Sequence, residues 1–203
     1  MAAAILEMSH LAMAKRWNKE RSKAHGNYRI FSVREDFYTH PDKEGERSFF
    51  VIEASDWVNV IAVTTDDDIV MIRQHRPGVG AVRLEIPGGI IEPGEEPVIA
   101  AARELAEETG YRGDAPELIC AVEPNPATHN NHCFSYLVRN AKRDIARDLD
   151  HDEVIDVELL PFSELSALLE NGELPHALLQ LPLLHYLRWR ETGRELAPNK
   201  NAS

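Results

Sequence analysis

Apolar side chains recur at helical spacing near the start of the chain. Residues 2–25 are rich in Ala, Leu and Lys, with apolar side chains at Ile5, Met8, Leu11 and Met13. This spacing predicts a leading amphipathic helix that ends at Gly26. Two β-rich runs follow, residues 28–33 and 48–52. They lie on either side of a polar turn at residues 41–45 and predict a small antiparallel β-ribbon.

Beyond residue 54 the pattern predicts strands interleaved with a few helices. Strands are expected near residues 58–64, 69–72, 118–122, 133–138 and 154–160, with a tight hairpin at residues 65–68. Helices are expected at residues 97–110, 162–170 and 175–189, and residues 77–91 are rich in Gly and Pro. This order indicates an α/β (α+β) fold, a mixed β-sheet sandwiched between helices. We divide the chain into an N-terminal extension (1–54), a catalytic domain (55–194) and a disordered tail (195–203).

Composition narrows the functional class. The chain has 203 residues, 34 acidic and 22 basic, with a net charge of −12. This charge argues against a nucleic-acid-binding protein, and a small anionic substrate would then need a metal or local arginines. Only Cys120 and Cys133 are present, and neither a secretion signal nor a membrane-spanning apolar run is found. We therefore expect a cytoplasmic protein with no membrane or nucleic-acid partner.

The predicted helix at residues 97–109 combines an apolar stripe with an unfavourable cluster of charge. Its stripe is expected to pack on the sheet and consists of Val98, Ala101, Ala102 and Leu105. Glu104, Glu107 and Glu108 repel one another beside it, near the helix C-terminus, where the dipole also disfavours negative charge. Carboxylates are hard ligands, so a divalent cation such as Mg²⁺ resolves the repulsion. A solvated acidic face is the alternative explanation.

The residues around this helix form an extended motif. Nine positions are defined over 23 residues, and the chain has Gly89, Glu95, Arg103, Glu104, Leu105, Glu107, Glu108, Gly110 and Tyr111 at them. The segment resembles the complete Nudix box. That resemblance implies a loop–helix–loop in which Glu104, Glu107 and Glu108 bind Mg²⁺. Mn²⁺ is a possible substitute for Mg²⁺.

The same resemblance assigns further roles. The backbone carbonyl of Gly88 matches another metal ligand, and Arg103 and Glu95 match a pair that orients the metal-binding glutamates. An ordinary surface ion pair is the alternative for Arg103 and Glu95. The implied reaction is attack of an activated water on one phosphorus of a pyrophosphate.

Flanking residues suggest the substrate. The segments 70–77 and 84–95 resemble the ADP-ribose pyrophosphatase branch, in which Arg76 matches an arginine that contacts the diphosphate. A guanidinium fork suits phosphate oxygens. Pro126, sixteen residues beyond Gly110, matches a proline of that branch. Gly89, at the start of the box, and Trp57 are the other predicted substrate-binding residues. We expect Trp57 to stack on the base of the substrate, and core or interface packing is the alternative for it.

The general base is expected on an acidic loop. Residues 125–132 contain no carboxylate, whereas residues 148–153 contain several. Glu153 is the first candidate and Asp152 the second, and a merely polar loop is the alternative. Relatives use the N-terminal ribbon to form a dimer, so a homodimer is expected.

ADP-ribose, cleaved to AMP and ribose 5-phosphate, is the preferred substrate. GDP-mannose or another nucleotide sugar is the alternative. A non-catalytic nucleotide sensor is the alternative from another functional class, but sensors typically lose box carboxylates that this chain retains.

Overall fold

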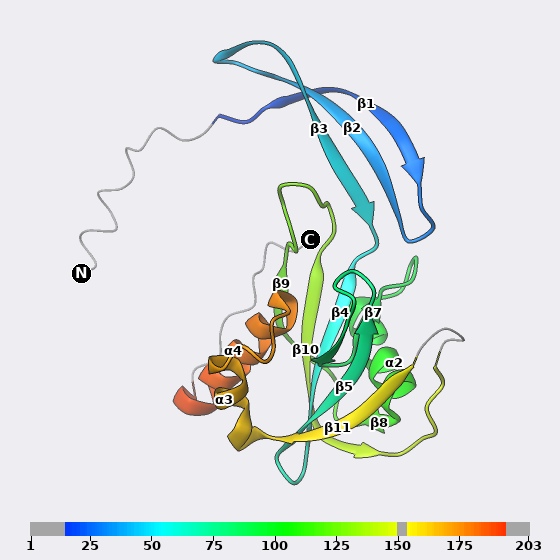
Figure 1. Cartoon of the computed structure of the whole chain (residues 1–203), viewed down its shortest axis with the longest axis vertical. Coiled ribbons are helices and arrows are strands. Elements are labelled where there is room, and N and C mark those ends of the chain that lie inside the picture. The colour runs from blue at the N-terminus through cyan, green and yellow to red at the C-terminus, as the bar shows by residue number, and fades with distance from the viewer. Residues whose placement is uncertain (1–14, 150–153, 194–203) are drawn as a thin grey trace, which may run out of the picture. The chain divides into compact units, whose positions relative to one another are not determined.

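The computed structural model describes residues 15–149 and 154–193 (Figure 1). The chain divides into two compact units. The first consists of Met1–Ala54 with Ala127–Asn130, and the second of Ser55–Pro126 with Asn131–Ser203. In the described residues no helix is long and apolar enough to cross a membrane.

The first unit is built on an antiparallel sheet. Its described strands are β1 (Asn18–Asn27), β2 (Phe31–His40) and β3 (Lys43–Ala54), in the order β1-β2-β3. The ribbon predicted from two β-rich runs is therefore confirmed, with longer strands and a third strand added. The leading helix is wrong over residues 18–25, which pair with β2 as a strand. Residues 2–14 of that prediction lie outside the described part of the chain.

Charge pairing across strands explains why the polar segment β1 is extended. Asp36 on β2 is fully buried, and it accepts hydrogen bonds from Lys19 (2.8 Å) and Ser22 (2.6 Å) on β1. Arg34 also donates to it, at 2.9 Å. Burial by itself would raise the pKa of Asp36, but these donors outweigh it and hold the pKa at about 2. A buried carboxylate needs such partners, and they override the helical spacing of the segment.

The second unit contains the large sheet. Its described strands run in the order β11-β5-β4-β10-β8, with β6 paired to β5, β7 to β4 and β9 to β10. β10 and β4 are parallel and the other pairs are antiparallel, so the sheet is mixed. The strands are β4 (Trp57–Thr64), β5 (Asp68–Arg76), β6 (Ala81–Glu85), β7 (Gly88–Ile90), β8 (Tyr111–Arg112), β9 (Glu117–Val122), β10 (Cys133–Arg143) and β11 (Ile155–Pro161).

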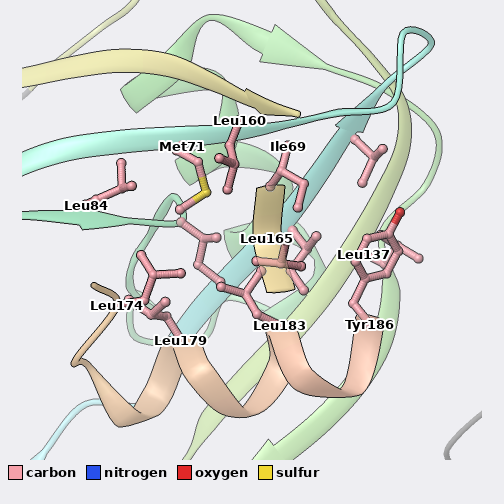
Figure 2. Packing of buried hydrophobic residues seen from close by; sticks show 13 residues of the cluster. Ile69, Met71, Leu84, Leu137, Leu160, Leu165, Leu174, Leu179, Leu183 and Tyr186 are labelled. Carbon is pink, nitrogen blue, oxygen red and sulfur yellow. The ribbon is translucent and has the colours of Figure 1, made fainter. Parts of the chain in front are cut away.

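Helices cover both faces of this sheet. α2 (Pro97–Thr109) packs with Val58, Val60 and Val70 in one apolar cluster. On the other face, the short η2 (Phe162–Glu164) leads into α3 (Leu165–Glu170), and α4 (Ala177–Thr192) follows. Figure 2 shows Leu179, Leu183 and Tyr186 of α4 pointing into the second cluster, toward Ile69 and Met71 of β5. The mixed sheet between helices is thus confirmed.

The predicted strands do not include two that the structure has. The Gly- and Pro-rich stretch at residues 77–91 contains strands β6 and β7, because β5 and β4 offer backbone partners to it. The buried face of α2 is also rotated from the predicted stripe. Val98 and Ala102 are exposed, and the buried residues are Ala100, Ala101, Leu105, Ala106, Glu108 and Thr109. The predicted disordered tail lies outside the described residues.

Candidate active site

Helix α2 carries the three glutamates and ends close to them. Pro97 occupies the first turn, where its missing N–H costs nothing, and Gly110 caps the C-terminus with a left-handed φ of 75°. The last turn has no basic residue that would offset the helix dipole. The last turn therefore leaves the charge of Glu107 and Glu108 to be compensated by Arg103, one turn earlier on the same helix, and by groups outside the helix.

Arg103 supplies much of that compensation. Its guanidinium donates to Glu104 at 2.9 Å and to Glu107 at 3.0 Å through Nη1. Its Nε and Nη2 grip both oxygens of Glu95, each at 2.9 Å. The hydrogen bond to Glu95 is the main cause that raises the pKa of Arg103, and reciprocally lowers that of Glu95. The Arg103 guanidinium thus orients Glu104 and Glu107 and links them to Glu95 in the loop before the helix.

Glu108 is held from the other side. Glu108 is only 3% exposed, and its Oε2 accepts a hydrogen bond of 2.9 Å from the backbone N–H of Gly88. The three glutamates therefore differ: Glu107 is open to solvent, whereas Glu104 and Glu108 are largely enclosed. Placing a carboxylate on the buried side of a helix requires partners, and β7 provides one.

Gly89 leaves the space that Glu104 occupies. A Cβ at position 89 would lie within 2.6 Å of all three atoms of the Glu104 carboxylate group. Real side chains do not tolerate such contacts, so only glycine allows Glu104 to lie against β7. The same strand packs closely at Gly88, where an added Cβ would overlap the backbone carbonyl of Val58.

These groups converge on one polar cavity of about 410 Å³, which we call the glutamate cavity. Its lining residues are Gln74, Arg76, Gly88, Gly89, Ile90, Glu92, Arg103, Glu104, Glu107, Glu108, Asp148 and Leu149. Within the described residues, no three acidic, His or Cys side chains are already grouped closely enough to hold an ion. The carboxylate donor set nevertheless suits Mg²⁺ or Mn²⁺, and the glycine cradle keeps Glu104 turned toward this cavity.

Arg76 lies at the end of β5, beside Glu85 of β6. Its Nη2 donates to Glu85 Oε2 at 2.7 Å, and its Nε lies 3.2 Å from both carboxylate oxygens. Glu85 is 4% exposed. Burial by itself would raise its pKa, but the neighbouring His176 and the hydrogen bonds from Arg76 prevail and hold the pKa at about 2.

A second cavity, of about 270 Å³, adjoins the first and shares Arg76 and β7 with it. We call it the Trp57 cavity. It is lined by Trp57, Val58, Asn59, Arg76, Gly88, Gly89, Ile90, Cys133, His176 and Leu178. Trp57 opens β4 and is partly buried, opposite Ile90 and Cys133 in the sheet. The glutamate cavity is polar and the Trp57 cavity is more apolar, and Arg76 lines both of them.

Not every predicted residue falls in these cavities. Pro126, whose match rested on spacing alone, lies in an exposed turn and lines neither cavity. Glu153 and Asp152 lie outside the described residues. Asp148, at the start of the same acidic run, lines the glutamate cavity, and its backbone N–H donates to the carbonyl of Glu107 at 3.1 Å. Asp148 therefore lies at the C-terminal end of α2, beside the cavity that the three glutamates line.

Two residues of this region escaped the sequence analysis. Glu85 carried a signal, a lone carboxylate between the apolar residues Leu84 and Ile86. His176 carried none, because only the tertiary fold brings the start of α4 to β6. Its Nδ1 lies 3.7 Å from Glu85 Oε1.

The chain is similar to several known proteins. The family model described as NUDIX domain matches residues 55–180. An ADP-ribose pyrophosphatase of Bacillus subtilis is 34% identical over 117 residues, covering 57% of this chain and 63% of that protein. A methanol dehydrogenase activator of Bacillus methanolicus is 36% identical over 108 residues, covering 53% and 58%. The chain thus spans less than two thirds of the length of these curated relatives.

A solved structure described as an ADP compounds hydrolase has the same fold. It superposes with a TM-score of 0.79 and 18% sequence identity, covering 92% of this chain and 100% of that one. At this identity the likeness concerns the fold.

Proposed function

This chain belongs to the Nudix family, and from that premise we propose that it is a metal-dependent pyrophosphohydrolase. Its substrate is a nucleoside diphosphate linked to a further group, with ADP-ribose the best candidate. One observation carries the proposal: Glu104, Glu107, Glu108 and Arg76 line a single cavity. The similarity to an ADP-ribose pyrophosphatase supports the choice of substrate.

Each residue has a distinct task in the proposed reaction. Glu104, Glu107 and Glu108, with the carbonyl of Gly88, hold the divalent cation, while Arg103 and Glu95 orient the glutamates. Arg76 binds the diphosphate, since a guanidinium pairs well with phosphate oxygens. When bound, the cation neutralises charge on the phosphate oxygens and makes water a better nucleophile.

The cleavage consumes one water. The water oxygen bonds to one phosphorus, the bridging P–O bond breaks, and the water proton passes to a general base, which we assign to Glu153 with Asp152 as second choice. ADP-ribose would thus yield AMP and ribose 5-phosphate. Trp57 offers an aromatic wall for one end of the substrate beyond Arg76.

The proposed function is tested with a substrate panel. ADP-ribose, GDP-mannose, NADH, diadenosine polyphosphates and nucleoside triphosphates are each incubated with Mg²⁺, with Mn²⁺ and with chelator. We expect ADP-ribose to be hydrolysed fastest, only with metal, to AMP and ribose 5-phosphate. Preference for GDP-mannose would keep the reaction and replace the substrate. Tight nucleotide binding with no turnover would identify a sensor instead.

Glu153→Gln is expected to lower kcat about 10- to 100-fold with little change in ADP-ribose affinity. General bases contribute roughly 10²- to 10⁴-fold, and a bound cation takes over part of that task. Steady-state kinetics and equilibrium binding in chelator measure the two effects separately. Asp152→Asn is the matched comparison, and a larger loss of kcat in that variant would transfer the role to Asp152.

We also propose that the chain forms a homodimer through its N-terminal unit. Aromatic and aliphatic side chains are exposed there: Tyr28 is 58% exposed, Ile30 64%, Phe49 44% and Phe50 53%. Exposed apolar side chains on a small sheet are candidates for a subunit interface. Sedimentation analysis of the purified protein tests this, and a monomer at micromolar concentration would contradict it.

A further inference from the structure

Glu85 is a deeply buried charged side chain next to the two cavities. It ends β6, and only 5% of its side chain is exposed. A buried carboxylate is costly unless cations or hydrogen-bond donors satisfy it. Arg76 supplies both, because its guanidinium donates to Glu85 through Nε and Nη2, and the Nδ1 of His176 lies 3.7 Å from Glu85 Oε1.

This arrangement pre-orients Arg76. A free arginine side chain has many rotamers, and ordering it on phosphate binding costs conformational entropy. In this fold the guanidinium is already held in one plane by Glu85, at the seam that both cavities share. A donor fixed before the ligand arrives binds more tightly than one that must be ordered on binding.

His176 extends this arrangement to the C-terminal helix. It is the residue just before α4, and its side chain does not cap the helix. It lines the Trp57 cavity together with Leu178, whose carbonyl accepts a hydrogen bond of 2.9 Å from Asn59 of β4. The start of α4 is therefore fastened to the sheet at this point, with the imidazole beside Glu85.

We infer that Glu85 and His176 are positioning residues that hold Arg76 in place to bind a diphosphate. Glu85 fixes the guanidinium directly, and His176 restricts the carboxylate of Glu85 through its approach to Oε1. The inference rests on the proposed function for the nature of the ligand. It assigns no contact between Glu85 and the substrate.

A neighbouring ion pair provides the matched control. Arg73, on the same strand as Arg76, donates to Glu158 through Nε at 2.6 Å and Nη2 at 3.0 Å. Both side chains are exposed, at 45% and 39%, and neither lines the two cavities. Glu158→Gln thus removes a carboxylate from an equivalent arginine fork outside the site.

The test is a double-mutant cycle on binding. Affinity for ADP-ribose is measured by calorimetry in chelator, where no hydrolysis takes place, for wild type, Arg76→Ala, Glu85→Gln and the double variant. We expect Glu85→Gln to weaken binding about tenfold, because the charged hydrogen bonds that order Arg76 are lost. The double variant should bind no more weakly than Arg76→Ala alone, and Glu158→Gln should bind like wild type.

His176→Asn should weaken binding by a smaller factor, about threefold, and should likewise have no effect once Arg76 is replaced. Additive losses in either cycle would overturn the inference, since Glu85 or His176 would then act independently of Arg76. If Glu85→Gln does not fold, Glu85→Asp replaces it, with thermal melting recorded for each variant.

The inference and the proposed function fail in different ways. If wild type binds ADP-ribose in chelator and the cycle is non-additive, the positioning role holds even when no panel compound is hydrolysed. If wild type binds neither ADP-ribose nor inorganic pyrophosphate in chelator, Arg76 holds no diphosphate and the inference is overturned. Hydrolysis with Mg²⁺ would then still support the proposed function.

Discussion

Glu108→Gln is expected to lower kcat on the order of 10³-fold with the fold retained. Loss of residues that merely support a metal ligand typically costs about 10- to 100-fold, so loss of a ligand itself should cost more. The fold should survive because the glutamine carbonyl still accepts the hydrogen bond that the Gly88 N–H donates to Glu108. Steady-state kinetics over a range of Mg²⁺ concentrations, with circular dichroism, measure both effects.

Glu96→Gln is the control for this variant. Glu96 precedes the first turn of the same helix, is exposed, and makes no side-chain capping bond. Its replacement removes the same charge from α2 outside the glutamate cavity and should leave kcat unchanged. A Glu108→Gln protein with near-normal kcat and an unaltered Mg²⁺ dependence would remove Glu108 from the metal site.

Gly89→Ala is expected to lower kcat about 100-fold or more. The three atoms nearest to the added Cβ all belong to the carboxylate at the end of the flexible Glu104 side chain, so the backbone of β7 can stay in place while Glu104 swings away. Misplacing a catalytic group by about 1 Å can cost around 100-fold. The expected signature is a large loss of kcat and weaker Mg²⁺ activation, with a small shift of Tm.

Gly78→Ala serves as the matched substitution. Gly78 lies in the turn after β5, and an added Cβ there meets nothing within 4 Å. It should retain wild-type kinetics. If Gly89→Ala also retained full activity, Glu104 would not need its place against β7, and its assignment as a ligand would fall.

Local spacing was enough to predict the helix of the site. The positions of Pro97 and Gly110 predict its two ends, and the structure places them there, because capping depends on a few adjacent residues. The pairing of Arg103 with Glu95 was likewise expected from the motif, and both side chains meet across one loop. Such features are encoded within about twenty residues of sequence.

Predictions that depended on partners elsewhere in the chain were less accurate. Apolar spacing on α2 suggested that Val98 and Ala102 face the sheet, but the side that packs includes the buried Glu108. Helical spacing near the start of the chain suggested a helix through residue 25. Residues 18–27 instead form a strand, from which Lys19 and Ser22 donate hydrogen bonds to the buried Asp36. In both cases a buried carboxylate and its distant partners outweighed the local pattern.

Local sequence patterns are enough to identify the Nudix family, to predict the mixed sheet between helices and to single out the three glutamates of the candidate metal site. In these patterns each residue is compared with close neighbours along the chain. The fold, in contrast, brings Glu85 next to both Arg76 and His176, and it sets Gly89 against Glu104. Burial and hydrogen bonding between strands and helices depend on which distant segments come into contact, and local spacing along the chain does not specify those contacts.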